Sequence, residues 1–599
     1  MHISLYRKAL CLLPLCAAMA LCQAAAPSAD TIYRNGYVYT VDAKDSVHQA
    51  LAVRDGRIIY VGNDAGAGAL RGKYTKVVDL RGRMLMPGLI DGHMHPVAGG
   101  AQLLHCNLNY EALTVAQFQS RIQACLDREG KNDASSLLTV VNWFQQNMLP
   151  AGTEVTSKVL DVLKTMRPIM VQSSFGHSAL ANSRALELAA ITRDTPDPTA
   201  GKITRDAAGN ATGILEDSAQ QLVGKLVPPE TDEDRVAAAR AALDAMRKQG
   251  ITNFLDAVAG EESITAFATL QRQGELTARA HFAVLLTPED ASADAVKAVA
   301  AVRALALRYD QGKPAPAPAL NVGAAKLFMD GVIAAPALTG VMLQPYNVNQ
   351  GTAAHPHWVP GTSKGPGIYF QPEVFNSVLL ELAKAGLDAH VHVDGDGAAR
   401  EALNGIAYLR STEAGKNARP ALAHNEIVDA ADFPRYAALD VSVVQSFQWE
   451  KPAPDTLGGL QGYLEPARYD TIEPAAPFQQ AGVRIAYGSD WPVDPLDEWF
   501  ALKVGMTRTN APEAGPQFAG RLGRDAGLSA ATVIRAITWN AAYTLRQEKE
   551  TGSLEPGKLA DLIVLDRNFF KIKPEDVAKT KVLLTVVGGK TVYRDPAFK

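Results

Sequence analysis

Two histidine pairs in this chain have the spacing of metal ligands. His93 and His95 follow an apolar stretch at residues 84–90, and His390 and His392 lie in a second stretch at 387–393. Alternate residues of a β-strand point to one face, so His93 and His95 can reach the same ion. Imidazole is a common ligand of zinc, iron and nickel. A single pair of this kind often has only a structural role, so the assignment of a metal site depends on further ligand candidates.

Two further candidates end apolar stretches of the same kind. His424 ends residues 419–424, and Asp490 ends residues 483–490 and precedes Trp491-Pro492. Histidine and aspartate at four predicted strand ends form a coherent ligand set for a hard or borderline cation. We therefore predict one metal centre that draws on widely separated parts of the chain.

The elements that must position these residues alternate along the middle of the chain. Between residues 87 and 547, strand-like stretches such as 251–255 and 324–329 alternate with helical stretches such as 236–248 and 372–385. Such alternation predicts βα units around a parallel sheet. The segment is far longer than the ~250 residues of a bare eightfold barrel. We therefore predict an α/β fold with an insertion at about residues 100–225.

Both ends of the chain have β-rich patterns. Residues 27–86 contain Asn35-Gly36 and Asp55-Gly56 between β-branched and aromatic stretches, and residues 548–599 contain strand-like stretches around Gly588-Gly589. These dipeptides between such stretches are hairpin signals. The two ends therefore bracket a central segment of a different kind.

The first 26 residues have the pattern of a secretory signal peptide. Arg7 and Lys8 precede an apolar stretch at residues 9–21, and the small residues 24–26 offer a cleavage site. The stretch is too short to span a bilayer comfortably. Lipid attachment at Cys22 is a poorer alternative, because the large Leu21 precedes it. We expect a periplasmic or secreted mature protein without a stable membrane anchor.

Composition narrows the partner but not the reaction. The 599 residues are 47% hydrophobic and 20% charged with a net charge of −4, which excludes disordered, collagenous and coiled-coil chains. Lys and Arg are not clustered as in nucleic-acid-binding proteins. We expect a small-molecule partner, and a homo-oligomer stays open. Cys106 and Cys125 could pair in an oxidising compartment or remain buried thiols, since spacing does not fix geometry.

Several motifs resemble one family over nearly the whole mature chain. They are residues 87–96, 176–183, 212–216, 326–331, 488–492 and 552–562. Together they are similar to the amidohydrolase superfamily of metal-dependent hydrolases, in particular its N-substituted formamide deformylase-like branch, amidohydrolase family 3. The resemblance implies a (β/α)8 TIM-like barrel at 87–547 beside a small β-sandwich made from residues 27–86 and 548–599. It specifies the family well and the substrate poorly.

The resemblance also assigns roles to individual residues. It implies that His93 and His95 bind the more buried of two divalent metals, expected to be zinc. His392 and His424 would bind the second metal, and a carbamate on Lys326 would bridge the two. Within the second pair, His392 fits the family pattern better than His390, because small residues and Asp396 follow it in the expected register.

Two residues have implied roles in the reaction itself. Asp490 would contact the first metal and the attacking water, act as general base, and pass the proton to the leaving amine. His177 would bind the substrate or its oxyanion, with a structural role as the alternative. An ion pair of Lys326 with Asp330 is the alternative to the carbamate. Two cations would acidify the water and polarise the carbonyl of a poor electrophile.

We therefore expect an exported metal-dependent hydrolase that cleaves an amide, formamide or N-acyl C–N bond of a small molecule. A mononuclear heterocycle deaminase is one alternative, but such deaminases tend to carry Glu where this chain has Gly395. A non-catalytic binding protein on the same scaffold is another. The chain departs from the family at Ala423, where Glu is usual, and at Ser446 and Gln448, where Pro and His are common.

Overall fold

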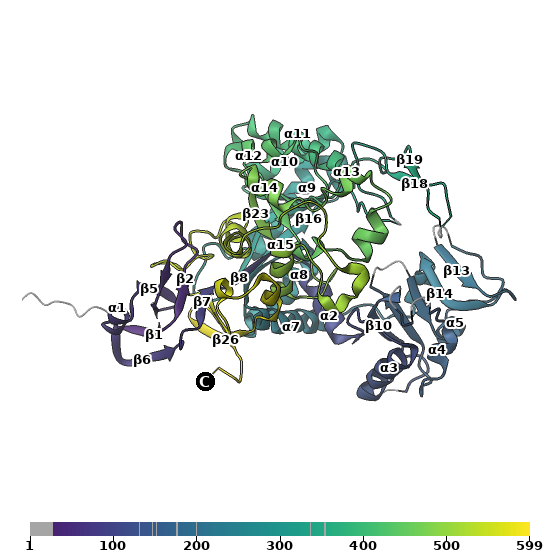
Figure 1. Ribbon diagram of the computed structural model, residues 1–599, viewed down its shortest axis with the longest axis horizontal. Coiled ribbons are helices and arrows are strands. Elements are labelled where there is room, and N and C mark those ends of the chain that lie inside the picture. The colour runs from purple at the N-terminus through teal and green to yellow at the C-terminus, as the bar shows by residue number, and fades with distance from the viewer. Residues whose placement is uncertain are drawn as a thin grey trace, which may run out of the picture.

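A computed structural model describes residues 28–130, 132–145, 148–150, 153–174, 178–198, 201–335, 337–352 and 355–598. Its centre is a ring of eight parallel strands in the order β23-β22-β21-β20-β17-β16-β15-β8 (Figure 1). They are β8 (Leu89–Met94), β15 (Ile251–Ala259), β16 (Arg279–Leu285), β17 (Leu320–Phe328), β20 (Asp388–Val393), β21 (Ala421–His424), β22 (Ser442–Gln445) and β23 (Arg484–Tyr487). The predicted (β/α)8 barrel is confirmed.

The helices between these strands pack outside the ring. They include α7 (Asp232–Gln249), α8 (Glu261–Arg272), α9 (Pro288–Tyr309), α10 (Pro372–Ala385), α11 (Asp396–Arg410) and α15 (Glu498–Thr507). Local sequence sets their ends: Thr231 and Asp234 form a capping box that begins α7, and Gly250 ends it at φ 92°. Apolar side chains on the outer face of the strands pack against the inner faces of the helices, and together they form the main core.

The ring closes where β23 meets β8. Beyond the two strand ends, the Asp490 N–H donates to the His93 carbonyl, and the His95 N–H donates to the Trp491 carbonyl, both at 2.7 Å. A Cβ at Gly488 would lie 2.4 Å from the Cβ of His93, so only glycine permits this approach. The first and last barrel strands are thereby fastened at their carboxyl ends.

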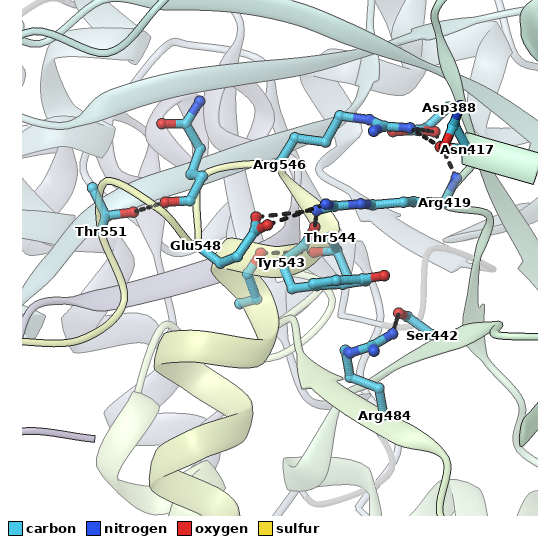
Figure 2. A network of polar contacts seen from close by, with 12 residues as sticks. Asp388, Asn417, Arg419, Ser442, Arg484, Tyr543, Thr544, Arg546, Glu548 and Thr551 are labelled. Carbon is cyan, nitrogen blue, oxygen red and sulfur yellow. Dashed lines mark hydrogen bonds and ion pairs between the residues drawn. The ribbon is translucent and has the colours of Figure 1, made fainter. Parts of the chain in front are cut away.

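Polar contacts close the opposite end of the ring (Figure 2). Arg546 pairs with Asp388 at the start of β20, and Arg419, just before β21, pairs with Glu548. The Arg419 and Arg484 guanidinium carbons lie 4.0 and 3.6 Å from the centroid of the Tyr543 ring in α17 (Ala541–Thr544). This end is therefore occupied by structural contacts, and space for chemistry is left at the carboxyl ends.

The two ends of the chain share one sheet, and a second sheet of amino-terminal strands packs against it, in agreement with the predicted β-sandwich. One sheet has the order β26-β25-β24-β7-β2-β3. Its amino-terminal members are β2 (Tyr37–Tyr39), β3 (Val47–His48) and β7 (Met84–Pro87), and its carboxyl-terminal members are β24 (Leu562–Leu565), β25 (Val582–Val587) and β26 (Lys590–Arg594). The other has the order β5-β4-β1-β6, built from β1 (Ala29–Arg34), β4 (Ala50–Arg54), β5 (Arg57–Gly62) and β6 (Arg71–Asp79). Buried side chains of both sheets form one cluster.

A separate sheet lies between β8 and β15 in the sequence. Its order is β13-β14-β12-β11-β10-β9, and its strands are β9 (Cys106–Asn107), β10 (Leu138–Trp143), β11 (Ile169–Ser173), β12 (Ser178–Ala181), β13 (Gly201–Arg205) and β14 (Ala211–Asp217). Figure 1 places it on the side of the barrel opposite the amino-terminal strands. It has cores of its own, and a disulfide joins Cys106 to Cys125 in α3 (Val115–Glu129). The domain boundaries themselves stay predictions.

A buried ion pair joins the barrel to the terminal strands. Arg279, the first residue of β16, contacts Asp561 with two hydrogen bonds of 2.7 and 3.1 Å, and both side chains are 2% exposed. Asp561 also accepts the Gly588 N–H. Removing one member would leave the other charge buried without its partner, which is far costlier than losing an exposed pair.

We expect Arg279→Ala to lower the free energy of unfolding by about 3–5 kcal/mol in urea titrations. Arg272→Ala is the matched control, because Arg272 is exposed on α8 and its one hydrogen bond among the described residues is to Thr269, so its loss should stay within about 0.5 kcal/mol. Equal effects of the two substitutions would contradict the role given to the Arg279–Asp561 pair.

Candidate metal centre

The predicted ligands converge at the carboxyl end of the ring. His93 lies in β8, Lys326 in β17, His392 in β20, and His424 is the last residue of β21. Asp490 follows β23, and His95 is the amino-terminal cap residue of α2 (Pro96–Leu104). The parallel strands all end here, so residues distant in sequence meet at one opening.

The first group of ligand atoms comes from the ring closure. The Asp490 Oδ1 atom lies 3.3 Å from His93 Nε2 and 2.9 Å from His95 Nε2. One ligand atom from each of these three residues lies within 4.8 Å of the other two. His93 and Asp490 are buried, whereas the His95 side chain is 26% exposed. This group could hold one cation with an approach from solvent on the His95 side.

The second group consists of His392, His424 and Asp394, whose ligand atoms also lie within 4.8 Å of one another. His392 Nε2 is 3.6 Å from Asp394 Oδ1 and 3.1 Å from the Gly331 carbonyl oxygen. His424 Nδ1 is buried and has no hydrogen-bond partner among the described residues. A buried nitrogen of this kind needs a partner, and a cation would supply it. The donor set therefore fits a metal ion.

Sequence reasoning did not select Asp394 as a ligand. It lies two residues after His392, inside the stretch that served only to fix the register of that histidine. Burial raises the pKa of Asp394 well above its usual value, and the charge of Glu426 raises it further. A neighbouring cation would offset both effects, because it favours the ionised carboxylate. The informative signal was an acid next to a buried strand end.

Lys326 is buried beside the first group. Its Nζ atom lies 3.4 Å from His93 Nε2, and the side chain is almost fully enclosed. Burial lowers the pKa of Lys326 to about 8. The Asp330 carboxylate accepts backbone N–H groups of Val341, Asp394 and Gly395, and the described residues include no ion pair between Asp330 and Lys326. The geometry does not provide the ion pair that was the alternative to a carbamate.

The two histidines of β20 have different neighbours. His390 Nε2 lies 2.8 Å from His93 Nδ1, so His390 contacts the ring nitrogen of His93 that faces away from Asp490. His392, two residues later, belongs to the second group. A hydrogen bond to the far nitrogen of an imidazole fixes the orientation and tautomer of the ring. His390 is therefore placed to orient His93.

The electrostatics favour neutral imidazoles and an ionised Asp490. Burial lowers the pKa of His93, His390 and His424 well below the usual value, and that of His392 to about 3. Burial alone would raise the pKa of Asp490, but the hydrogen bond with His95 and the nearby charges outweigh it and lower the pKa. Neutral imidazole and carboxylate are the protonation states that bind metal.

Asp91 fastens the elements that carry the first group, and sequence reasoning missed it. Its Oδ1 accepts the N–H groups of His93 and Ser489, both at 3.0 Å, and its Oδ2 accepts the Ser489 hydroxyl at 2.5 Å. His93 and Asp490 are thus held by one carboxylate that joins β8 to the loop after β23. An acid within a buried apolar strand was the available signal.

The last residues singled out in the sequence are His177 and the three departures from the family pattern. His177 lies outside the described residues. Ala423 packs with Ile90, Val444 and Ala486 in a cluster of small apolar side chains, so this departure from the family changes the packing inside the barrel. Ser446 and Gln448 contact the backbone of the loop that carries Asp490.

Comparisons with known proteins agree with this arrangement. Residues 76–593 match the amidohydrolase family. The chain is 27% identical to the putative amidohydrolase YtcJ of Bacillus subtilis, over 94% of this chain and 99% of that protein. It is 25% identical to the N-substituted formamide deformylase of Arthrobacter pascens, over 94% and 98%. The structure of an uncharacterized metal-dependent hydrolase from Pyrococcus horikoshii has the same fold, with a TM-score of 0.67 at 20% identity over 91% of this chain and 99% of that one.

The family match spans most of the chain and includes both strand ends that carry the first ligand group. The chain belongs to the amidohydrolase family and is a metal-dependent hydrolase that acts on carbon–nitrogen bonds.

Proposed function

We propose that this protein is an exported hydrolase of a small amide, formamide or N-acyl compound. The hydrolase would use two divalent metal ions, and zinc is the metal that we expect. The observation that carries the proposal is the pair of ligand groups, His93 with His95 and Asp490 beside His392 with Asp394 and His424, at one end of the barrel. The relative from Arthrobacter pascens is named for deformylation of N-substituted formamides, which supports this substrate class.

The chemistry of the donor set agrees with two cations. When bound, such ions polarise the carbonyl of the scissile bond and acidify a water molecule. The chain contributes neutral imidazoles, and carboxylates that are unfavourable when buried without a cation. The Nδ1 atom of His424 is buried without a hydrogen-bond partner in the described part of the chain. These features together suit metal ligation better than a structural core.

Asp490 is the residue best placed to move a proton. Its Oδ1 atom already lies between His93 and His95, and its lowered pKa keeps it ionised at neutral pH. An ionised carboxylate can accept a proton from the attacking water and deliver it to the leaving amine nitrogen. The leaving amine needs that proton, because an amide anion is a poor leaving group. We assign His177 to substrate or oxyanion binding on the family resemblance alone.

Lys326 has the properties that carbamate formation requires. A neutral lysine amine attacks carbon dioxide, the N–C bond forms, and one amine proton is released. Burial brings the pKa of Lys326 to about 8, so the neutral form is a minority at pH 7 but far more populated than in an exposed lysine, and it increases as the pH rises. The product carries a carboxylate next to His93, where it could bridge both ligand groups.

The first test is a hydrolysis screen. Zinc-loaded mature protein should bind about two zinc ions per chain and hydrolyse members of a panel of N-formyl, N-acyl and lactam compounds. A chelator should abolish turnover, and zinc with bicarbonate should restore it. His93→Ala is the control and should not recover. Absence of bound zinc after reconstitution, or turnover that resists chelation, would contradict the mechanism.

The carbamate is tested by substitution of Lys326. Lys326→Ala should lower kcat by about 100-fold or more, and added short carboxylic acids should restore part of the rate by replacing the missing carboxylate. Lys326→Arg keeps the charge, fills the space that an added acid would need, and should remain inactive. Wild-type rates in Lys326→Ala would end the assignment.

Export is supported by the amino-terminal pattern and by the disulfide between Cys106 and Cys125. Among the described residues, no helix is both long and apolar enough to cross a membrane. Expressed in full length in a Gram-negative host, the protein should appear in the periplasm with an amino terminus near residue 27 and with no titratable thiol before reduction. A cytoplasmic product that retains residue 1 would refute export.

A further inference from the structure

One short segment contacts His424 of the second ligand group and the backbone directly before Asp490 of the first. Residues 446–451 follow β22, and Trp449 stacks on His424 with ring centroids 5.4 Å apart and 18° between the planes. The Ser446 hydroxyl donates to the Gly488 carbonyl at 2.8 Å, and the Gln448 Nε2 donates to the Ser489 carbonyl at 2.5 Å. These two carbonyls belong to the residues directly before Asp490. The segment therefore spans from the end of β21 to the loop after β23.

We propose that Ser446 and Gln448 are positioning residues, which hold the Asp490 carboxylate beside His93 and His95 by fixing the backbone before it. The inference rests on the proposed function, because that function gives Asp490 its role in proton transfer. Neither side chain needs to touch the substrate. Both act through the backbone of Gly488 and Ser489.

Backbone pairing does not extend far enough to do this alone. The register between β22 and β23 ends at the pair of Gln445 and Tyr487, and one further backbone bond runs from the Gly488 N–H to the Gln445 carbonyl. Beyond that pair, the side-chain hydrogen bonds of Ser446 and Gln448 continue the connection to the next two carbonyls. Both side chains are buried, where such bonds are shielded from competing water.

The chemistry of the two side chains suits this task. A carbonyl oxygen only accepts, so each partner must be a donor, and a hydroxyl and an amide NH2 group both qualify. The orientation of the Gln448 amide follows, since its own oxygen would repel the Ser489 carbonyl. Lys451 fixes the same segment further: its Nζ donates to the Gln448 carbonyl at 2.5 Å and lies 3.7 Å from Asp494 Oδ2.

Asp490 needs such support because its own backbone is unfavourable. Its φ of 52° lies in the left-handed region, which is uncommon for residues other than glycine, although aspartate adopts it more readily than most. The Asp490 N–H is bonded to the His93 carbonyl on one side of the loop. Ser446 and Gln448 hold the carbonyls on the other side, so the carboxylate is fixed between two barrel strands.

The two departures from the family pattern at Ser446 and Gln448 fit this positioning role. Proline, common in the family at position 446, has no hydroxyl to donate, whereas Ser446 adds a donor to the Gly488 carbonyl. Histidine, common at position 448, can donate from its ring, and Gln448 provides the same function with an amide. Gln448→His is therefore the conservative variant, and Gln448→Leu removes the donor while keeping the approximate volume.

The experiment compares Gln448→Leu with a matched control on the same strand. Asn540 Nδ2 donates to the Ile485 carbonyl of β23 at 2.7 Å, away from Asp490, so Asn540→Leu also removes an amide-to-carbonyl bond. Hydrogen exchange measured by mass spectrometry on metal-free protein should show faster exchange of residues 488–492 in Gln448→Leu and an unchanged rate there in Asn540→Leu. This measurement needs neither a metal nor a substrate.

Kinetics on a substrate from the hydrolysis screen provide the second measurement. Gln448→Leu should lower kcat by about 10- to 100-fold with little change in KM, because a displaced carboxylate affects the reacting step more than binding. Gln448→His should restore most of the rate, and Asn540→Leu should retain it.

Unchanged exchange of residues 488–492 in Gln448→Leu would overturn the inference, as would an equal loss of kcat in Asn540→Leu. If the wild-type protein hydrolyses nothing in the panel, the proposed function fails. The exchange comparison still decides whether Gln448 holds the loop.

Discussion

The closure of the barrel between its first and last strands is the constraint on which the site depends. Asp91 accepts three donors from His93 and Ser489, and Gly488 lets the two strand ends approach without a clash. His95 and Asp490 are 395 positions apart in sequence, yet this closure brings their side chains to 2.9 Å.

At this end of the barrel the protein buries polar groups for which its own residues do not supply enough hydrogen bonds or opposite charge. Neutral histidines, the amine of Lys326 and the carboxyl groups of Asp394 and Glu426 lie close together, and burial shifts their pKa values toward the uncharged forms. Such a cluster is costly unless charge is supplied to it. Divalent cations would favour the ionised form of these carboxylates and would give the unpartnered nitrogen of His424 a partner.

Rigidity around the site comes from contacts in several directions. Helix-side packing fixes the strands, the Arg419–Tyr543–Arg484 stack closes the opposite end, and residues 446–451 connect the ends of β21 and β23. The separate sheet reaches the same loop, because the Tyr110 hydroxyl donates to the Pro492 carbonyl at 2.9 Å. The loop that carries Asp490 is thus held by β8, by residues 446–451 and by Tyr110. Such support suits a group that must be aligned with a reacting bond.

The sequence by itself determined the periodic pattern of strands and helices, the β-rich ends and the ligand types at the strand ends, because alternation and side-chain chemistry are local properties. His93, His95, His424 and Asp490 could be chosen on that basis. The tertiary structure alone decided which of them meet. It brought His424 beside His392 and Asp394, turned His390 toward His93, paired Cys106 with Cys125, and made Asp91 the link between the first and last strands. Those outcomes depend on distances between side chains of different elements, and spacing along the sequence does not specify such distances.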